Sequence, residues 1–388
     1  MIPFIDLKAQ YNRIAGPVEA AVLDVMRSGT FILGPVVQQL EERLAAFAGT
    51  RHCVSCASGT DALVMALMAK GIGPGDAVFT VPFTFMASAE AIVTVGATPI
   101  FVDIEPGSFN LDPAALERAV AALAAGDTES HVLPRWPVDR LKALRPRGII
   151  AVDLFGLPAD YTALNAMAAR HDLFVIEDAA QSFGATAQNK RAGSLAEIGC
   201  TSFFPAKPLG CFGDGGAIFC DDPELDKLLR SIRVHGQGGH KYENVRMGIT
   251  GRLDAVQAAV LNVKLDIFED EIAARQRVAA RYDAQIVATG LPLITPPIPQ
   301  GVISAWAQYT LVAESPDART AYQARLAEHG VPTMVYYPKG LHEQLAFADL
   351  GYARGDFPVT EAMGDRVFSL PMHPYLDDAT IDSIVASL

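Results

Sequence analysis

The chain has 388 residues, half of them hydrophobic and 19% charged, and its 44 acidic against 31 basic side chains give a net charge of −13. This composition excludes an intrinsically disordered chain, and the acidic balance argues against binding to nucleic acid or to anionic membranes. No apolar run approaches the roughly 18 residues needed to span a bilayer, and the N-terminus lacks a signal-peptide pattern, which together predict a cytoplasmic protein of about two domains.

Strand-like and helical segments alternate through the first part of the chain. Short apolar runs predict strands at 52–56, 77–81, 99–103, 148–152, 174–177 and 217–220, and helices are predicted at 61–69, 87–94 and 159–170. This alternation predicts a mainly parallel sheet covered by helices. Ligands of such sheets bind at the carboxyl ends of the strands, which is where Ser58, Asp178 and Lys207 fall.

Two segments depart from this alternation. Residues 122–147 are polar and contain prolines, which predicts a surface excursion. After Arg252 the pattern changes to a helical segment at 253–290, a proline-rich stretch at 291–301, and strands at 309–312 and 334–337 that flank a helix at 319–329. We therefore predict a large domain at 1–250 and a smaller α+β domain at 251–388.

The five cysteines show no spacing typical of a disulfide framework. Cys53 and Cys56 match the C-x-x-C spacing, yet no second pair completes a zinc site and the run is strand-like. We expect buried, inert thiols and no metal site.

The segment Ser58-Gly59-Thr60 joins a predicted strand to the start of a helix. Backbone N–H groups and the helix dipole favour a phosphate at such a place, Gly59 permits close approach, and two hydroxyls add donors. Helix capping by Ser58 is the alternative. Phe85, after the next strand, can stack on a flat heterocycle or pack in the core.

Asp178 closes an apolar strand, and Lys207 follows 29 residues later (207 − 178) in a stretch rich in Phe, Pro and Gly. A lysine amine can form a Schiff base with an aldehyde cofactor, and a carboxylate can keep the pyridine nitrogen of pyridoxal phosphate protonated. Gln181 is placed to reach another edge of such a ring. Apolar surroundings would lower the pKa of the Lys207 amine, which suits this chemistry. A helix cap at Asp178 and a solvated Lys207 are the alternatives.

A basic run lies between Arg230 and Arg252. It contains Arg230, Arg233, Lys241, Arg246 and Arg252 against a single acid, Glu243. Such a run can attract an anionic substrate, or it can be a solvated loop.

Taken together, these motifs resemble the DegT/DnrJ/EryC1/StrS family of sugar-nucleotide aminotransferases over nearly the whole chain. The resemblance is carried by Phe31-Ile32-Leu33-Gly34-Pro35, Ser58-Gly59-Thr60-Asp61, Glu177-Asp178-Ala179-Ala180-Gln181, Lys207-Pro208-Leu209-Gly210 and Leu370-Pro371-Met372-His373-Pro374. It implies the α/β aspartate aminotransferase fold (fold type I), with a mainly parallel seven-stranded sheet in the large domain and a smaller C-terminal α+β domain. It also implies a homodimer with active sites at the subunit interface.

The resemblance also implies roles for single residues. Lys207 would bond the pyridoxal phosphate, Asp178 would contact its pyridine nitrogen, Gln181 its ring hydroxyl and Phe85 its ring face, and Ser58, Gly59, Thr60 and Ser202 would hold the phosphate. Thr250 stands where many members have an asparagine that reaches the cofactor of the partner subunit. Arg252, Tyr336 and His342 are expected to contact substrate, Arg252 by a fork on a carboxylate, while Tyr336 replaces a histidine common in close relatives.

The implied reaction moves an amino group from L-glutamate to a keto-sugar nucleotide, with pyridoxamine phosphate between the two halves. Gln181 and residues 201–216 most resemble enzymes that aminate C3 of UDP-2-acetamido-2-deoxy-3-oxo-glucuronate, for bacterial surface polysaccharides such as lipopolysaccharide O-antigen. Amination of a dTDP- or UDP-4-keto-6-deoxyhexose is one alternative, and a non-catalytic regulatory or binding protein on the same fold is another. Relatives that dehydrate sugars carry histidine where this chain has Lys207, so dehydration is not expected.

Overall fold

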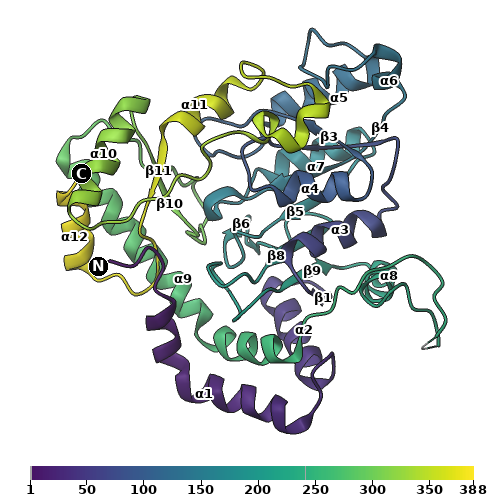
Figure 1. Ribbon diagram of the computed structural model, residues 1–388, viewed down its shortest axis with the longest axis horizontal. Coiled ribbons are helices and arrows are strands. Elements are labelled where there is room, and N and C mark those ends of the chain that lie inside the picture. The colour runs from purple at the N-terminus through teal and green to yellow at the C-terminus, as the bar shows by residue number, and fades with distance from the viewer. Residues whose placement is uncertain (1, 241) are drawn as a thin grey trace.

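The computed structural model of the chain describes residues 2–240 and 242–388, so Met1 and Lys241, the latter a member of the basic run, lie outside the described residues. A seven-stranded sheet forms the centre of the molecule (Figure 1). Its order is β1 (His52–Cys56), β9 (Gly216–Cys220), β8 (Ile198–Ser202), β5 (Phe174–Asp178), β4 (Arg145–Val152), β2 (Asp76–Thr80) and β3 (Thr98–Phe101). β9 runs antiparallel to both its neighbours, whereas the other pairings are parallel. The predicted mainly parallel sheet is confirmed.

Both faces of this sheet are buried. Adjacent residues of one strand pack into different hydrophobic clusters: Ile149 and Val175 join one cluster, and Ile150 and Ile176 the other. The first face is covered by α5 (Pro113–Ala125) and α7 (Tyr161–Arg170), and the second by α3 (Gly59–Ala69), α4 (Ala87–Thr94) and α8 (Pro223–Arg233). Continuous apolar strands, which guided the sequence prediction, are typical of parallel sheets covered on both sides.

The longest described helix, α9 (Ala255–Thr289), connects the two parts of the molecule (Figure 1). Near its start, Ala258 and Leu261 share a hydrophobic cluster with α2 (Pro35–Ala48), and α1 (Leu7–Ser28) lies alongside. Further on, Val278 and Tyr282 pack in the cluster of the C-terminal elements. Although α9 has 35 residues, neither it nor any other helix in the described part of the chain is apolar enough over the length needed to cross a membrane. The domain division near residue 250 stays a prediction.

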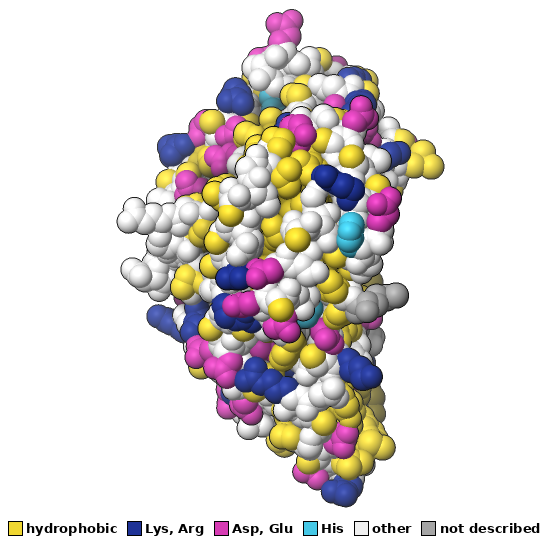
Figure 2. All heavy atoms as spheres, turned by 90° about the vertical axis from the view of Figure 1, so that its left-hand side faces the viewer, with side chains coloured by type: hydrophobic (Ala, Val, Ile, Leu, Met, Phe, Trp, Pro, Cys, Tyr) yellow, Lys and Arg dark blue, Asp and Glu magenta, His cyan; other side chains and the backbone are white. Residues whose placement is uncertain are grey.

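The C-terminal unit is built on a two-stranded antiparallel sheet, β10 (Tyr309–Val312) with β11 (Val367–Leu370). It contains α10 (Pro316–Glu328), α11 (Pro358–Arg366) and α12 (Asp378–Ala386). Two ion pairs join α12 to α9, Arg277–Asp378 at 2.9 Å and Arg281–Asp382 at 2.6 Å. Figure 2 shows acidic and basic side chains mixed over the face of the molecule that includes this unit.

Two segment predictions are wrong in part. The run at 334–337 forms no strand, although Met334 makes an isolated bridge to Ser369. Pro332 and Pro338 flank the run, and proline donates no ladder hydrogen bond, so the buried β11 pairs with β10 instead. The segment 122–147 is not wholly a surface excursion, because its first residues continue α5, residues 138–142 form α6 (Val138–Lys142), and β4 begins at residue 145.

The five cysteines are free and buried, as predicted. Cys53 and Cys56 lie in β1, and burial raises the pKa of both thiols, so they carry no reactive thiolate. The remaining short elements are β6 (Thr186–Ala187), β7 (Lys190–Arg191) and the 3₁₀ turns Leu154–Gly156, Leu341–Glu343 and Leu345–Leu350.

Candidate active site

The structure brings the four predicted phosphate ligands together at the start of α3. Ser58 caps this helix, because its Oγ accepts a hydrogen bond from the N–H of Asp61 at 3.0 Å. Gly59 lies against the end of β8, where an added Cβ would stand 2.6 Å from the Cβ of Ser202. Only glycine fits this approach, which places Ser202 beside the free N–H groups at the helix start. Ser58, Gly59, Thr60 and Ser202 thus form a group of donors at a helix start, of the kind that binds a phosphate.

Asp178 ends β5 at the same edge of the sheet and is only 6% exposed. Ser88 of α4 donates a hydrogen bond to its Oδ2 at 2.8 Å, and the N–H of Ala180 donates to Oδ1 at 3.2 Å. Burial raises the pKa of the Asp178 carboxyl, while these two donors and the charge of Lys207 lower it. A buried carboxylate is stabilised by a neighbouring cation, and a protonated pyridine ring is such a cation.

Lys207 lies in the segment between β8 and β9, close enough to Asp178 for the two charges to interact. Burial lowers the pKa of its amine, and the Asp178 carboxylate raises it. Within residues 2–240 and 242–388 the amine makes no hydrogen bond or ion pair of its own. A largely desolvated amine of this kind is available as a nucleophile, which favours the Schiff-base role over the solvated lysine considered from the sequence.

Gln181 and Phe85 lie around the same space. Oε1 of Gln181 accepts a hydrogen bond from the N–H of Phe155 at 2.6 Å, and its Nε2 donates to the hydroxyl of Tyr337 at 3.3 Å. The ring of Phe85 is 57% exposed, with its centroid 6.5 Å from that of Tyr337. An exposed ring next to Tyr337, which contacts Gln181, offers a face for stacking rather than a core contact.

Thr250 and Arg252 reach the site from the chain just before α9. The N–H of Ala57 donates to the carbonyl of Gly251 at 3.1 Å, which holds this segment next to the phosphate loop. Thr250 is exposed, and its hydroxyl lies 2.8 Å from Nε2 of His235. The guanidinium of Arg252 forms no ion pair in the described part of the chain, and its Nε is buried without a hydrogen-bond partner there.

Two of the described arginines of the basic run, Arg230 and Arg233, are neutralised within the protein. Arg230 and Arg233 both bind the buried Glu41, at 2.7 Å and 2.5 Å, and Arg230 also binds Asp226. Burial raises the pKa of Glu41, but the two arginines more than offset this and leave it below its ordinary value. Among the described residues of the run, the anionic-substrate interpretation therefore rests on Arg246 and Arg252, of which Arg246 contacts the hydroxyl of Ser231.

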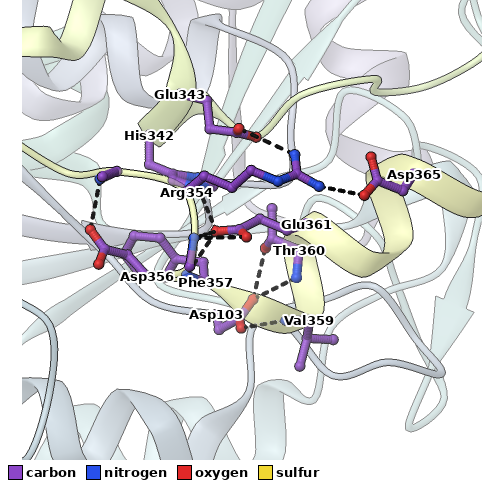
Figure 3. Close-up of polar contacts among 12 residues, drawn as sticks. Asp103, His342, Glu343, Arg354, Asp356, Phe357, Val359, Thr360, Glu361 and Asp365 are labelled. Atoms are coloured by element: carbon purple, nitrogen blue, oxygen red, sulfur yellow. Dashed lines mark hydrogen bonds and ion pairs between the residues drawn. The ribbon is translucent and has the colours of Figure 1, made fainter.

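Tyr336 and His342 are placed differently from each other. Tyr336 is half-buried, with its ring 6.3 Å from that of Phe4. His342 is 2% exposed, its Nε2 lies 3.1 Å from Glu361 Oε1, and its ring packs edge-on against Phe357 at 4.8 Å (Figure 3). The structure does not bring His342 into the Lys207 site, because the ring folds back against Gly340, whose missing Cβ leaves the space.

The hydrogen bonds around His342 fix the segment 340–366 to the large sheet (Figure 3). Asp103, just after β3, accepts hydrogen bonds from the N–H groups of Val359 and Thr360, both at 2.9 Å, and so caps α11. Glu361 accepts from the N–H of Gly355 at 2.7 Å and 2.8 Å. Because this anchored segment begins three residues after Tyr337, it helps to keep the hydroxyl of Tyr337 in contact with Gln181.

Sequence reasoning missed several polar residues of the site. Ser88 contacts Asp178, and Tyr337 contacts Gln181. The sequence signal that could have indicated Ser88 is a serine hydroxyl about one helical turn after Phe85. Below them, the buried carboxyls of Asp153 and Glu177 lie against each other, and burial raises the pKa of both, that of Asp153 to about 7. Ser182 donates a hydrogen bond to Asp153 at 2.6 Å, which joins this carboxyl pair to the residue that follows Gln181.

The residues present fit pyridoxal phosphate. The cradle at Gly59 accepts a phosphate, the buried Asp178 accepts a cationic ring nitrogen, and the exposed face of Phe85 accepts a flat ring. The unpaired amine of Lys207 lies near enough to Asp178 to bond the aldehyde of the same molecule.

Comparisons with known proteins agree with this arrangement. Residues 13–388 match the model of the DegT/DnrJ/EryC1/StrS aminotransferase family. A relative from Pseudomonas aeruginosa, named UDP-2-acetamido-2-deoxy-3-oxo-D-glucuronate aminotransferase, is 47% identical over 100% of this chain and 99% of its own. The crystal structure of a DegT DnrJ EryC1 StrS aminotransferase from Brucella abortus is 46% identical, with a TM-score of 0.92 over 100% of this chain and 98% of that one. NtdA from Bacillus subtilis, solved with bound cofactor PMP, is 28% identical, with a TM-score of 0.87 over 100% of this chain and 84% of that one.

These likenesses extend over whole chains and confirm the predicted fold and family. They also confirm that the chain is an enzyme and that its cofactor is pyridoxal phosphate. The chain belongs to the DegT/DnrJ/EryC1/StrS aminotransferase family, and the chemistry of that family fits the residues gathered around Lys207.

Proposed function

We propose that this aminotransferase moves the amino group of L-glutamate to C3 of UDP-2-acetamido-2-deoxy-3-oxo-glucuronate, for amino sugars of bacterial surface polysaccharides such as lipopolysaccharide O-antigen. Support for the sugar comes from the full-length likeness to the Pseudomonas aeruginosa relative of that name. The observation in the site that carries the proposal is the guanidinium of Arg252, which forms no ion pair with any described residue.

Arg252 suits substrates that carry carboxylates. Glutamate brings two carboxylates, and an oxidised glucuronate brings one at C6. A guanidinium binds a carboxylate through two parallel hydrogen bonds, which fixes orientation as well as charge. Because Gly251 is bonded to Ala57 beside the phosphate loop, Arg252 would act close to the cofactor phosphate.

Pyridoxal phosphate, when bound, supplies an aldehyde that takes up the amino group and a ring that stabilises negative charge at the α-carbon. Lys207 Nζ would bond that aldehyde at rest and would be released when the amine of glutamate takes its place. Its lowered pKa favours the neutral form, which would then remove the α-proton of glutamate. In the second half the same amine carries the proton in the reverse direction. Asp178, which accepts a hydrogen bond from Ser88, would hold a proton at the ring nitrogen in both halves.

We further infer a homodimer that works in the cytoplasm. The segment between α8 and α9 extends from the edge of the sheet (Figure 1) and exposes Val245 and Met247, the latter by 88%. Exposed apolar side chains of this kind are typical of protein contacts, and a second copy would bring this segment, with Thr250, towards a neighbouring site.

The proposal is tested by supplying the purified holoenzyme with L-glutamate and either the 3-keto uronate or a dTDP-4-keto-6-deoxyhexose. Mass spectrometry and NMR of the product would identify the aminated carbon, with the Lys207→Ala variant as the control for uncatalysed transfer. We expect an amine at C3 of the uronate with release of 2-oxoglutarate. Faster amination of the 4-keto sugar would show that the proposed 3-keto substrate is wrong and would favour the 4-keto-6-deoxyhexose instead.

A further inference from the structure

Lys264 of α9 is a buried cation that the reaction described above does not use. Its side chain is 2% exposed, and its Nζ donates a hydrogen bond to the carbonyl of Gly210 at 2.6 Å. Nζ also lies 4.7 Å from the centre of the Phe212 ring. Both contacts are made to the segment that carries Lys207.

The burial of this charge is poorly compensated. No carboxylate lies within ion-pair distance of Lys264 in the described ranges, and Glu271, the acid that faces it along α9, is occupied by Gln10 and Tyr375. Burial accordingly lowers the pKa of the Lys264 amine to about 8. A methionine or leucine would fill such a place without desolvating a charge, so packing alone does not account for a lysine here.

The acceptor of this hydrogen bond belongs to a tight turn. An added Cβ on Gly210 would lie 2.5 Å from the carbonyl oxygen of Pro205 and 2.6 Å from that of Phe204. The N–H of Lys207 donates to the carbonyl of Phe204 at 2.9 Å within the same turn. The backbone therefore links the carbonyl held by Lys264 to the residue that bonds the cofactor.

A second residue of α9 holds the far end of the turn. Oε1 of Gln257 accepts a hydrogen bond from the N–H of Phe212 at 2.8 Å, so α9 binds the segment on both sides of Cys211. Burial and the charge of Asp178 are what shift the pKa of Lys207. We infer that Lys264 influences Lys207 through the position of the backbone in this turn.

We propose that Lys264 is a positioning residue, whose hydrogen bond to Gly210 sets the turn that aims the amine of Lys207 at Asp178 and the bound cofactor. The inference rests on the assignment of Lys207 as the lysine that bonds pyridoxal phosphate. It adds to that function a residue that touches neither cofactor nor substrate.

The test compares Lys264→Met with Lys70→Met. Lys70 is matched to Lys264, because its Nζ also combines one polar contact, to Glu197 at 2.8 Å, with a ring contact, to Phe174 at 5.4 Å, but away from the Lys207 turn. Hydrogen exchange of the peptide covering residues 203–212, measured with and without the cofactor, reports the turn directly. Stopped-flow absorbance of the holoenzyme with L-glutamate reports the first half-reaction, independently of which sugar is the acceptor.

In Lys264→Met we expect exchange of this peptide to rise roughly tenfold, as for the loss of one buried hydrogen bond. The maximal rate of the half-reaction should fall by roughly 10- to 100-fold, as expected when a reacting group is displaced by about 1 Å. The glutamate concentration that gives half of the maximal rate should change little. Lys70→Met should change neither the exchange nor the maximal rate. A half-reaction within about twofold of wild type, or equal effects in both variants, would overturn the proposal.

If Lys264→Met does not fold, Gln257→Leu decides the question, because it removes the other contact of α9 with the turn. The same rise in exchange and the same loss of rate are expected, and unchanged values overturn the proposal. If Lys207→Ala still bonds the cofactor, the assignment of Lys207 fails instead, so the two failures are distinguishable.

Discussion

Ser88→Ala removes the hydroxyl that donates to the buried Asp178 carboxylate at 2.8 Å. A hydrogen bond to a charged group contributes about 1.5–3 kcal/mol, which corresponds to roughly 10- to 100-fold in the stability of that charge. In the variant the carboxylate is less stabilised and holds the proton at the ring nitrogen less firmly. We therefore expect the half-reaction with glutamate to slow by roughly 10-fold or more, while the fold is retained because Ser88 is replaced by a smaller residue.

Stopped-flow absorbance and cofactor titration of the purified variant measure this effect. Thr84→Val is the matched control, because the hydroxyl of Thr84 contacts Ser88 at 3.2 Å but makes no contact with Asp178. It should leave the half-reaction within about threefold of wild type, since its hydrogen bond is one step removed from the charge. Equal rates for Ser88→Ala and wild type, or equal losses in both variants, would refute the role given to Ser88.

Gly59→Ala brings a Cβ to within 2.6 Å of Ser202, so cofactor affinity should fall by roughly 10-fold or more in an equilibrium titration, whereas Gly16→Ala, with open space around it, should not change it. Arg252→Lys keeps the positive charge but loses the two parallel hydrogen bonds of a guanidinium. KM for glutamate or for the uronate, whichever carboxylate Arg252 binds, should therefore rise by about 10-fold without loss of thermal stability. An unchanged KM for both substrates would contradict this role of Arg252. Burial lowers the pKa of His373 from 6.5 to about 4, so the unfolded state binds more protons in this window and stability falls as the pH falls from 6.5 to 4. Between pH 7 and pH 4, the free energy of unfolding measured with urea should fall by up to about 3 kcal/mol less in His373→Gln than in wild type. His329→Gln, at an exposed histidine, is the control. An equal fall in His373→Gln and wild type would argue against this role of His373.

Six of the seven strands could be predicted, because they are short, largely apolar and buried on both faces. β8 was not predicted, since its residues Ile198–Ser202 include glycine, threonine and serine and give no apolar run of their own. Asp178 and Lys207 could be predicted for a similar reason, since their chemistry and order in the chain are recognisable without the fold. The strand predicted at 334–337 shows the limit of this reasoning. Its apolar residues suit a strand, but Pro332 and Pro338 and the competing β11 decide the pairing, and this competition is settled by tertiary contacts.

The missed site residues depend on contacts between distant parts of the chain. Ser88 meets Asp178 across 90 residues, and Gln181 meets Tyr337 across 156. Neither hydroxyl differs in sequence from an ordinary surface serine or tyrosine. His342 illustrates the reverse error, because a histidine in a plausible place was expected at the substrate and lies instead in a buried pair with Glu361.

The amine of Lys207 is expected to bond the cofactor beside Asp178, and this bond can be located directly. Reduction of the holoenzyme with sodium borohydride, followed by proteolysis and mass spectrometry, would locate the bond on a single lysine. We predict the pyridoxyl mass on the peptide containing Lys207 and its disappearance in Lys207→Ala. The pyridoxyl mass on another lysine, such as Lys264, or on no lysine, would show that Lys207 does not bond the cofactor.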